Sequence, residues 1–564
     1  MALTGIGQTR TLSPLAHWRR HVLEDRWWVP LAFWAILLAI VVMVSLPQSP
    51  SMSRQGRDSG VYVYTARVIL DGGVPYRDVW DNKTPLVFFT NAAALLFFGP
   101  DLWSLWIIQI LSFAATGGLF FGLLSRLYAG QTRLIWGGTL LFLFQAHHYV
   151  LNGAGNFSEL YALLPQVVCL IAGYRFLEQP RARWVLLLGA SAGIAFLFKQ
   201  NTVGVALAAV PALLLVRSPL LQSRRRWHWL ALAIAGGLSV LGAMAFYLAA
   251  RGALYDAFMA TFVSPSQFHN WVSGRSVPPW ETLRGTLTSP AVLLTMGPLA
   301  PLAIYGWVLG VRRGLAKQIR SRRDAILAAF ALWVALTFVL DMALANLSNR
   351  AGDIGYAHYF ITPMPAFVLL SMPALKRLAN FRPRQRRERA LRLATWAYIV
   401  LVTVLWLPVT LIGQMIVTGS NPLGDEIEHP LKDYITETTS PEDSVLIWGA
   451  SSMLNFQTQR PSPSRFHYGY PLIVPGEYSQ ENIDQFVDDL EANQPALIVD
   501  ATLNDGDRIP PLDPYMRAAW WVSGGRRDVA DLSAVYDFVS DHCATINRID
   551  AYRVYRCEYD SRAT

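Results

Sequence analysis

Three stretches of the sequence carry side chains suited to group-transfer chemistry. Asp58, Asp81 and Lys83 lie together between two apolar runs near the N-terminus. Lys199 lies between two further apolar runs, and His358 lies at the start of another. A carboxylate can take the proton of an acceptor hydroxyl, while Lys or His can neutralise a departing phosphate. These residue types therefore indicate transfer of a group from a phosphate-bearing donor.

Other interpretations of the same residues are open. Lys199 sits at a helix end, so it either binds an anion at membrane depth or extends its ammonium group to the interface. His358 equally suits an interfacial histidine with its hydrogen bonds satisfied, as do His147 and His148. The sequence contains no metal-ligand spacing, no glycine-rich phosphate loop and no Ser-His-Asp pattern.

Composition places these residues in a membrane protein. Of the 564 residues, 53% are apolar and 15% are charged, whereas a soluble domain has roughly a quarter charged. A disordered chain, a disulfide scaffold and an ordinary cytosolic enzyme are excluded. From Ser420 onward there are 24 acidic and 11 basic residues, a net charge of −13 within a total of +9. The basic remainder belongs to loops beside a membrane and is no evidence for nucleic-acid binding.

Apolar runs long enough to cross a bilayer predict about eleven transmembrane helices, because a span needs roughly 20 residues. They start near Trp28, Leu102, Leu134, Ser158, Trp184, Thr202, Trp229, Pro290, Ala325, Phe360 and Leu393. A further run, Pro85 to Phe98, is shorter and ends at Gly99-Pro100. We predict that it does not cross.

Loop charges predict the orientation of the chain in the membrane. If Pro85–Phe98 does not cross, 27 Lys and Arg residues fall on the N-terminal side of the membrane and 10 on the other. Basic loops stay in the cytoplasm. The sequence therefore predicts a multi-pass protein of the inner or plasma membrane, with a cytoplasmic N-terminus and an extracytoplasmic C-terminal region. The reactive side chains then share the outer face.

The strand and helix patterns of the C-terminal region predict a separate soluble α/β domain. Ser444–Trp448 and Ala496–Val499 are typical of buried strands, and Ile483–Glu491 of the helix between them. We expect a membrane domain, 1–419, with its first external loop at about 48–101, and an extracytoplasmic domain, 420–564. Cys543 and Cys557 lie in the latter, either as a disulfide or as two free thiols.

The first external loop resembles that of the GT-C superfamily of lipid-linked-sugar glycosyltransferases. The similar segments are Arg57-Asp58-Ser59-Gly60-Val61-Tyr62, Tyr76-Arg77-Asp78 and Asp81-Asn82-Lys83-Thr84-Pro85-Leu86. Phe196–Gln200, His358-Tyr359-Phe360 and Ser440–Ser444 are also similar to family patterns. The nearest branch is that of protein O-mannosyltransferases and aminoarabinose transferases. The chain departs from that pattern at Ser59, where the family has a second acidic residue, and at Thr84, where it has proline.

The resemblance implies an inverting transfer of sugar from a polyprenyl-phosphate donor to a hydroxyl at the outer face of the membrane. The acceptor class stays open between a protein, a glycolipid and a polysaccharide. Asp58 is the expected general base, with Asp81 as the second catalytic candidate. The donor phosphate is expected at Lys83, Lys199, His358 and Arg350. The expected substrate pocket comprises Tyr62, Tyr76, Asp78, Glu159 and Gln200.

No resident cofactor or metal site is predicted, although a divalent ion stays open because relatives differ in using one. Two other function classes compete with transfer. A lipid or polysaccharide transporter or flippase would also have about a dozen spans, but it should place charges near the bilayer midplane and show repeat symmetry. Asp341 is the only acid well inside an apolar run, and no repeat is visible. A non-catalytic scaffold would not need Asp58, Lys83 and Lys199 on one face.

Overall fold

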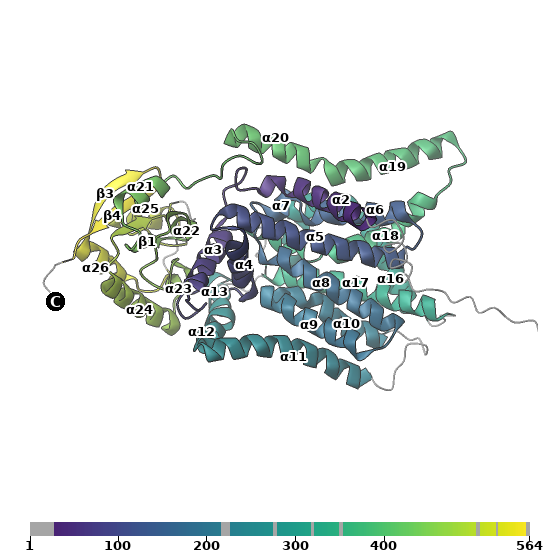
Figure 1. Cartoon of the computed structure of the whole chain (residues 1–564), viewed down its shortest axis with the longest axis horizontal. Helices are drawn as coiled ribbons and strands as arrows, with labels where there is room; N and C mark the ends of the chain where they lie inside the picture. The colour runs from purple at the N-terminus through teal and green to yellow at the C-terminus, as the bar shows by residue number, and fades with distance from the viewer. Residues whose placement is uncertain are drawn as a thin grey trace, which may run out of the picture.

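The structure, a computed structural model, describes residues 28–215, 226–273, 279–316, 321–348, 354–503, 508–525 and 528–559. Long helices run side by side as a bundle, and a small domain containing the β-sheet caps one end of it (Figure 1). The predicted fold class, a multi-pass helical membrane protein with a C-terminal α/β domain, is confirmed.

Helices begin close to all the predicted span starts. In chain order they are α2 (Trp28–Ser45), α5 (Leu102–Leu127), α6 (Thr132–Ala146), α8 (Ser158–Glu178), α9 (Ala182–Phe198), α10 (Gly204–Leu215), α11 (Arg226–Ala250), α15 and α16 (Pro290–Thr295, Ala300–Gly314), α17 (Arg322–Ser348), α18 (Met364–Asn380), and α19 with α20 (Arg386–Val404, Trp406–Thr418). Six helices of the described residues are long and apolar enough to cross a membrane by themselves. The total of eleven spans stays a prediction.

Small residues let the bundle helices approach closely, as is common between helices in membranes. A Cβ atom on Gly189 of α9 would lie 1.8 Å from the carbonyl oxygen of Ala233 in α11. A Cβ on Gly306 of α16 would lie 1.7 Å from the carbonyl oxygen of Leu370 in α18. Glycine is therefore required at both crossings.

Two shorter helices lie between the bundle and the sheet domain (Figure 1): α3 (Arg57–Leu70) and α4 (Leu86–Phe98). With 13 residues, α4 is about 20 Å long, which is less than the roughly 30 Å hydrocarbon core of a bilayer. Its buried face packs with Val63 of α3 and with Met453 and Phe456 of the C-terminal domain. The helix predicted from Pro85–Phe98 thus supports the C-terminal domain.

The C-terminal domain contains a four-stranded sheet in the order β1-β2-β4-β3. Strands β1 (Val445–Trp448) and β2 (Leu497–Asp500) are parallel and joined through α24 (Glu477–Asn493), as the sequence pattern predicts. Strands β3 (Cys543–Ile549) and β4 (Tyr552–Cys557) add an antiparallel hairpin beside β2. A linker after α20 leads to α21 (Lys432–Thr438), which packs against the sheet, so we propose the same division near residue 419.

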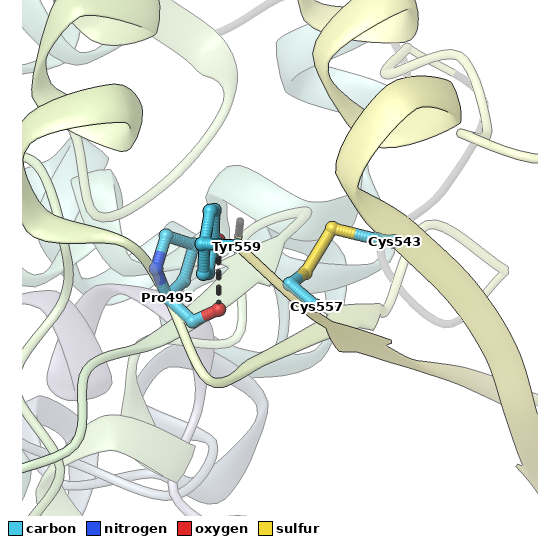
Figure 2. Close-up of a disulfide and its surroundings, with 4 residues drawn as sticks. All are labelled: Pro495, Cys543, Cys557 and Tyr559. Carbon is cyan, nitrogen blue, oxygen red and sulfur yellow. Dashed lines mark hydrogen bonds between the residues drawn. A yellow bond between two sulfur atoms is a disulfide. The ribbon is translucent and has the colours of Figure 1, made fainter. Parts of the chain in front are cut away.

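The two external cysteines form a disulfide (Figure 2). Cys543 and Cys557 are directly opposite each other across β3 and β4, so the hairpin ends are joined covalently. Tyr559 then donates a hydrogen bond to the carbonyl oxygen of Pro495 at 3.0 Å, which ties the chain end to the segment before β2. The disulfide alternative of the sequence analysis is confirmed. Cys169, the remaining cysteine, is free and buried.

The connection between α18 and α19, with its cluster of arginines, lies at the end of the bundle away from the sheet domain (Figure 1). We predict that a membrane-impermeant thiol reagent applied from outside labels Tyr515→Cys, which is 86% exposed, and does not label Arg386→Cys. The native cysteines give no background because they are bonded or buried. Labelling of Arg386→Cys alone in intact cells would reverse the predicted orientation.

Candidate active site

A buried ionic cluster lies where the first turn of α8, the last turn of α9 and the 3₁₀ segment η5 (Ile354–Ile361) meet. Lys199 forms an ion pair with Oε1 of Glu159, and Nε2 of His358 lies 3.6 Å from the same oxygen. Ser158 donates a hydrogen bond to the other oxygen of Glu159 at 3.0 Å. The three residues Glu159, Lys199 and His358 are all buried. A buried cluster of this kind is costly unless its members compensate one another, and it marks a functional-site candidate.

The helix ends favour the charges placed on them. Glu159 lies in the first turn of α8, where the positive end of the helix dipole stabilises an anion. Lys199 is the C-cap of α9, where the negative end of the dipole stabilises a cation. The cluster is thus built from complementary helix termini that are 40 residues apart in sequence.

Aromatic rings fix the two basic side chains. The Lys199 ammonium lies 3.6 Å from the ring centroid of Tyr359, a cation–π contact. The imidazole of His358 stacks on the ring of Phe157, with centroids 4.2 Å apart and planes within 1° of parallel. The sequence analysis did not single out Phe157. Its position two residues before the predicted pocket residue Glu159 is the only sequence signal for it.

The first external loop supplies a second, more accessible set of charges. Asp58 lies in the first turn of α3, and its Oδ1 is 4.0 Å from Nζ of Lys83. Lys83 also donates a hydrogen bond to the side chain of Asn82 at 3.1 Å. The buried carboxylate of Asp81 accepts the backbone N–H of Lys83 at 2.7 Å. The side chains of Asp58 and Lys83 stay 30% and 23% exposed, so a substrate can reach them.

The surroundings shift the pKa values of the two loop carboxyls in opposite directions. Burial would raise the pKa of Asp58, but the neighbouring positive charges, foremost that of Lys83, hold it below its usual value. Burial raises the pKa of Asp81 to about 6, and the nearby Asp58 charge adds to this rise. The charge of Lys199 in the buried cluster therefore also acts on the loop carboxyl of Asp58. At pH 7, Asp58 is the more firmly ionised of the two.

Two tyrosines of the predicted pocket support this arrangement. Tyr62 of α3 is buried and packs against Phe88 of α4, with ring centroids 6.1 Å apart. Tyr76 donates its hydroxyl hydrogen to the carbonyl oxygen of Lys83 at 2.8 Å. Its backbone is in the left-handed region, with φ of 74°, which costs free energy for a bulky residue and is held by the packed loop. Tyr76 therefore positions Lys83.

The structure leaves other predicted pocket residues outside this cluster. Asp78 is exposed, paired with Arg77 at 2.8 Å, and accepts the backbone N–H of Val74, so it organises the loop. Gln200 donates a side-chain hydrogen bond to the carbonyl oxygen of Thr261 at 3.2 Å. Thr261 lies in the π-helical turn Met259–Val263. Arg350 lies outside the described residues.

A buried asparagine, Asn156, connects the elements around the cluster and was not identified from the sequence as a functional residue. Its backbone N–H donates to Gln109 of α5 at 2.6 Å, and its side-chain amide donates to Ser59 of α3 and Asn91 of α4, both at 2.9 Å. Tyr161 of α8 donates to its carbonyl oxygen at 2.9 Å. Asn156 adopts a φ of 57°, which asparagine tolerates better than most residues. It holds α3, with Asp58, against α8, with Glu159.

Asp341, the one acid inside an apolar run, lies apart from these contacts on α17. It is buried against α10, where a Cβ on Gly204 would come within 2.0 Å of its Oδ1. Within the described ranges, no three His, Cys, Asp or Glu side chains are grouped closely enough to hold a metal ion.

Comparison with known proteins places this arrangement in a known fold. Residues 82–251 match the family model described as dolichyl-phosphate-mannose-protein mannosyltransferase. A crystal structure of ArnT from Cupriavidus metallidurans bound to undecaprenyl phosphate superposes with a TM-score of 0.56, at 16% identity, over 93% of this chain and 97% of that chain. The chain shares the fold of this ArnT. The apo state of the same ArnT gives a TM-score of 0.51 at the same identity and coverage.

The resemblance to the GT-C superfamily that the first external loop indicated is therefore confirmed. No curated protein sequence matches the chain. The family match begins at Asn82 and includes the predicted site residues Lys83, Glu159 and Lys199, but it does not extend to Asp58 or His358.

Proposed function

We propose that this protein transfers a sugar from a polyprenyl-phosphate donor to an acceptor hydroxyl at the outer face of the membrane, with inversion at the anomeric carbon. The observation that carries the proposal is the alternation of carboxylates and cations at the junction of the bundle and the C-terminal domain. Asp58 and Lys83 are accessible there, and Glu159, Lys199 and His358 lie buried behind them. The ArnT structure that shares this fold is bound to undecaprenyl phosphate, which supports a lipid phosphate as the donor class.

The donor phosphate is held by Lys83, Lys199 and His358. The two lysines supply positive charge, and the neutral imidazole of His358 donates a hydrogen bond. Lys83 faces the accessible side, and Lys199 and His358 lie deeper, towards the bundle in which the polyprenyl chain is embedded. When the bond between the anomeric carbon and the phosphate oxygen breaks, negative charge grows on the phosphate. Preorganised cations in a water-poor site stabilise that charge in the transition state more than in the ground state.

Asp58 is the general base. Its carboxylate takes the proton of the acceptor hydroxyl while the acceptor oxygen forms the new bond to the anomeric carbon on the face opposite the phosphate. The products are the glycosylated acceptor and the polyprenyl phosphate, and the proton ends on Asp58. A base must first reach the hydroxyl. Asp58 is 30% exposed, whereas Asp81 is 2% exposed and already accepts a backbone hydrogen bond.

Glu159 is a positioning residue in this scheme, because it holds Lys199 and His358 in place. Its charge also has a consequence for donor binding. With Asp58, Asp81 and Glu159 ionised, Lys83 and Lys199 charged and His358 neutral, the described site has two positive and three negative charges. An incoming phosphate therefore favours proton uptake, for which Asp81, with a pKa of about 6, is well suited.

The C-terminal domain closes over the site and handles the acceptor. Its residues contact the loop and helix that carry Asp58: Arg57 donates a hydrogen bond to Tyr470, and Ser462 donates its backbone N–H to the hydroxyl of Tyr64 at 2.8 Å. Arg465 forms an ion pair with Asp256 at 2.8 Å, which anchors the domain to the short helix α12 (Leu254–Phe258). An acceptor that reaches Asp58 must pass this boundary.

The proposal is tested by supplying membranes that contain the protein with a panel of radiolabelled polyprenyl-phosphate sugars. We expect the labelled sugar of one donor to become attached to a second molecule. Membranes without the protein should show no such transfer. A transporter or flippase would instead move the intact labelled lipid between leaflets, which proteoliposomes resolve by its accessibility to an external sugar-oxidising reagent. Movement without cleavage would replace transfer as the function.

The pH dependence of transfer distinguishes the two candidate bases. Because the pKa of Asp58 lies below its usual 3.8, the base stays ionised as pH falls from 7 to 5. At saturating donor we therefore expect a nearly constant turnover number over this range. If Asp81 were the base, turnover would fall about tenfold per unit below pH 6, where its carboxyl takes up a proton. Such a fall in the wild type, together with loss of transfer in Asp81→Asn, contradicts the role of Asp58.

A further inference from the structure

A cavity of about 620 Å³ lies at the opposite end of the bundle from the ionic cluster, between α16, α17, α18 and the end of α5. The cluster side chain His358 precedes α18, whereas the cavity residues Lys376 and Arg377 lie in its last turns. Lys376 lies 12 residues after Met364, where α18 begins, so about 18 Å of helix separates the start of α18 from the cavity rim. The cavity is therefore separate from the proposed donor site.

The helix crossing at Gly306 bounds the cavity on its inner side. Helices α16 and α18 are in backbone contact there, with Gly306 against the carbonyl oxygen of Leu370. Past this crossing, Pro373 lacks the N–H for one backbone hydrogen bond of α18. Both contact residues line the cavity, so its inner end lies at the crossing.

The wall of the cavity is apolar and its rim is cationic. Side chains such as Leu309, Phe330 and Leu369 line the inner part, while Arg313, Lys376 and Arg377 line the outer part. None of the lining residues is acidic.

Two tyrosines hold the rim cations. Arg377 donates a hydrogen bond to the hydroxyl of Tyr305 at 3.1 Å. The ammonium of Lys376 lies 5.7 Å from the ring centroid of Tyr128. These neutral partners orient the cations without neutralising their positive charge, so the rim attracts an anion.

We propose that this cavity binds one anionic diacyl phospholipid from the leaflet on the side opposite the C-terminal domain. The headgroup phosphate lies among Arg313, Lys376 and Arg377, and one acyl chain enters between α16, α17 and α18. Basic pockets between transmembrane helices suit this chemistry, since a cation near the membrane surface contributes on the order of a fivefold gain in affinity for an anionic lipid. An apolar wall without a cationic rim would not distinguish lipids by charge.

The test is a titration of the purified protein with dioleoyl phosphatidylglycerol or dioleoyl phosphatidylcholine, with bound lipid counted by native mass spectrometry. We expect one phosphatidylglycerol to bind at least tenfold more tightly than phosphatidylcholine. The double variant Lys376→Gln/Arg377→Gln should lose that preference. The matched variant Arg386→Gln/Arg387→Gln removes the same charge from exposed positions of α19, which do not line the cavity, and should keep it.

A second variant separates the acyl chain from the headgroup. Ala331→Phe narrows the apolar part of the cavity and leaves the three cations in place, so it should weaken phosphatidylglycerol binding while thermal stability is maintained. Equal affinity for the two lipids in the wild type, an equal loss in the α19 control, or unchanged binding in Ala331→Phe would each overturn the proposal. The experiment measures lipid binding and not glycosyl transfer, so its result does not depend on whether the proposed transfer activity is correct.

Discussion

Replacing Asp58 with Asn should lower the turnover number of sugar transfer by roughly 10²–10⁴ while donor affinity changes little. Asparagine has nearly the shape of aspartate but cannot take the proton of the acceptor hydroxyl. The loss should appear in the turnover number because the donor is held mainly by Lys83, Lys199 and His358. Steady-state kinetics at saturating donor, with donor binding measured separately, check this result.

Two matched variants give this experiment its controls. Asp71→Asn makes the same chemical change at the other end of α3, where the carboxylate is exposed and paired with Arg67 at 3.2 Å, and it should leave turnover unchanged. Asp81→Asn tests the rival carboxyl of the same loop. If Asp81→Asn abolishes transfer and Asp58→Asn remains active, the role of base belongs to Asp81.

Replacing Lys199 with Met should weaken donor binding about tenfold to a hundredfold, because a hydrogen bond to a charged group contributes roughly 1.5–3 kcal/mol. The structure changes how this experiment must be designed. No carboxylate lies near Lys199 along the sequence, but in the structure Lys199 pairs with Glu159, which is 40 residues earlier. Lys199→Met alone would leave a buried, uncompensated carboxylate, which is strongly destabilising.

The double variant Lys199→Met/Glu159→Gln removes both charges and avoids that penalty. If Lys199 contacts the donor phosphate, the double variant folds and still binds donor at least tenfold more weakly than the wild type, as isothermal titration with polyprenyl phosphate would report. If Lys199 only neutralises Glu159, donor affinity in the double variant returns to the wild-type value, and the phosphate-binding role is lost.

Much of the fold could be predicted because apolar runs and turn residues act locally. The starts of the bundle helices, the short α4 and the two parallel strands all follow from patterns within about 20 residues. The hairpin of β3 and β4 was not predicted, although its cysteines were considered for a disulfide. Its strands are polar on the exposed side, as in Thr545 and Asn547, and their pairing depends on β2, more than 40 residues earlier.

The site was predictable by residue type but not by pairing. The predicted topology places Asp58, Lys83, Lys199 and His358 on the outer face, which indicated that they form one site. However, no local pattern shows that Glu159 lies against both Lys199 and His358, because that contact depends on how α8, α9 and η5 pack. The same holds for Asn156, whose hydrogen bonds reach three other helices.

The fate of the anomeric bond is the most direct measure of the central claim. Purified protein is incubated with a polyprenyl-phosphate sugar of known anomeric configuration and its acceptor, and the product is examined by NMR. A single displacement with Asp58 as base predicts a new glycosidic bond of inverted configuration, formed by the wild type and lost in Asp58→Asn. A product of retained configuration, or a donor that leaves the reaction intact, would contradict it.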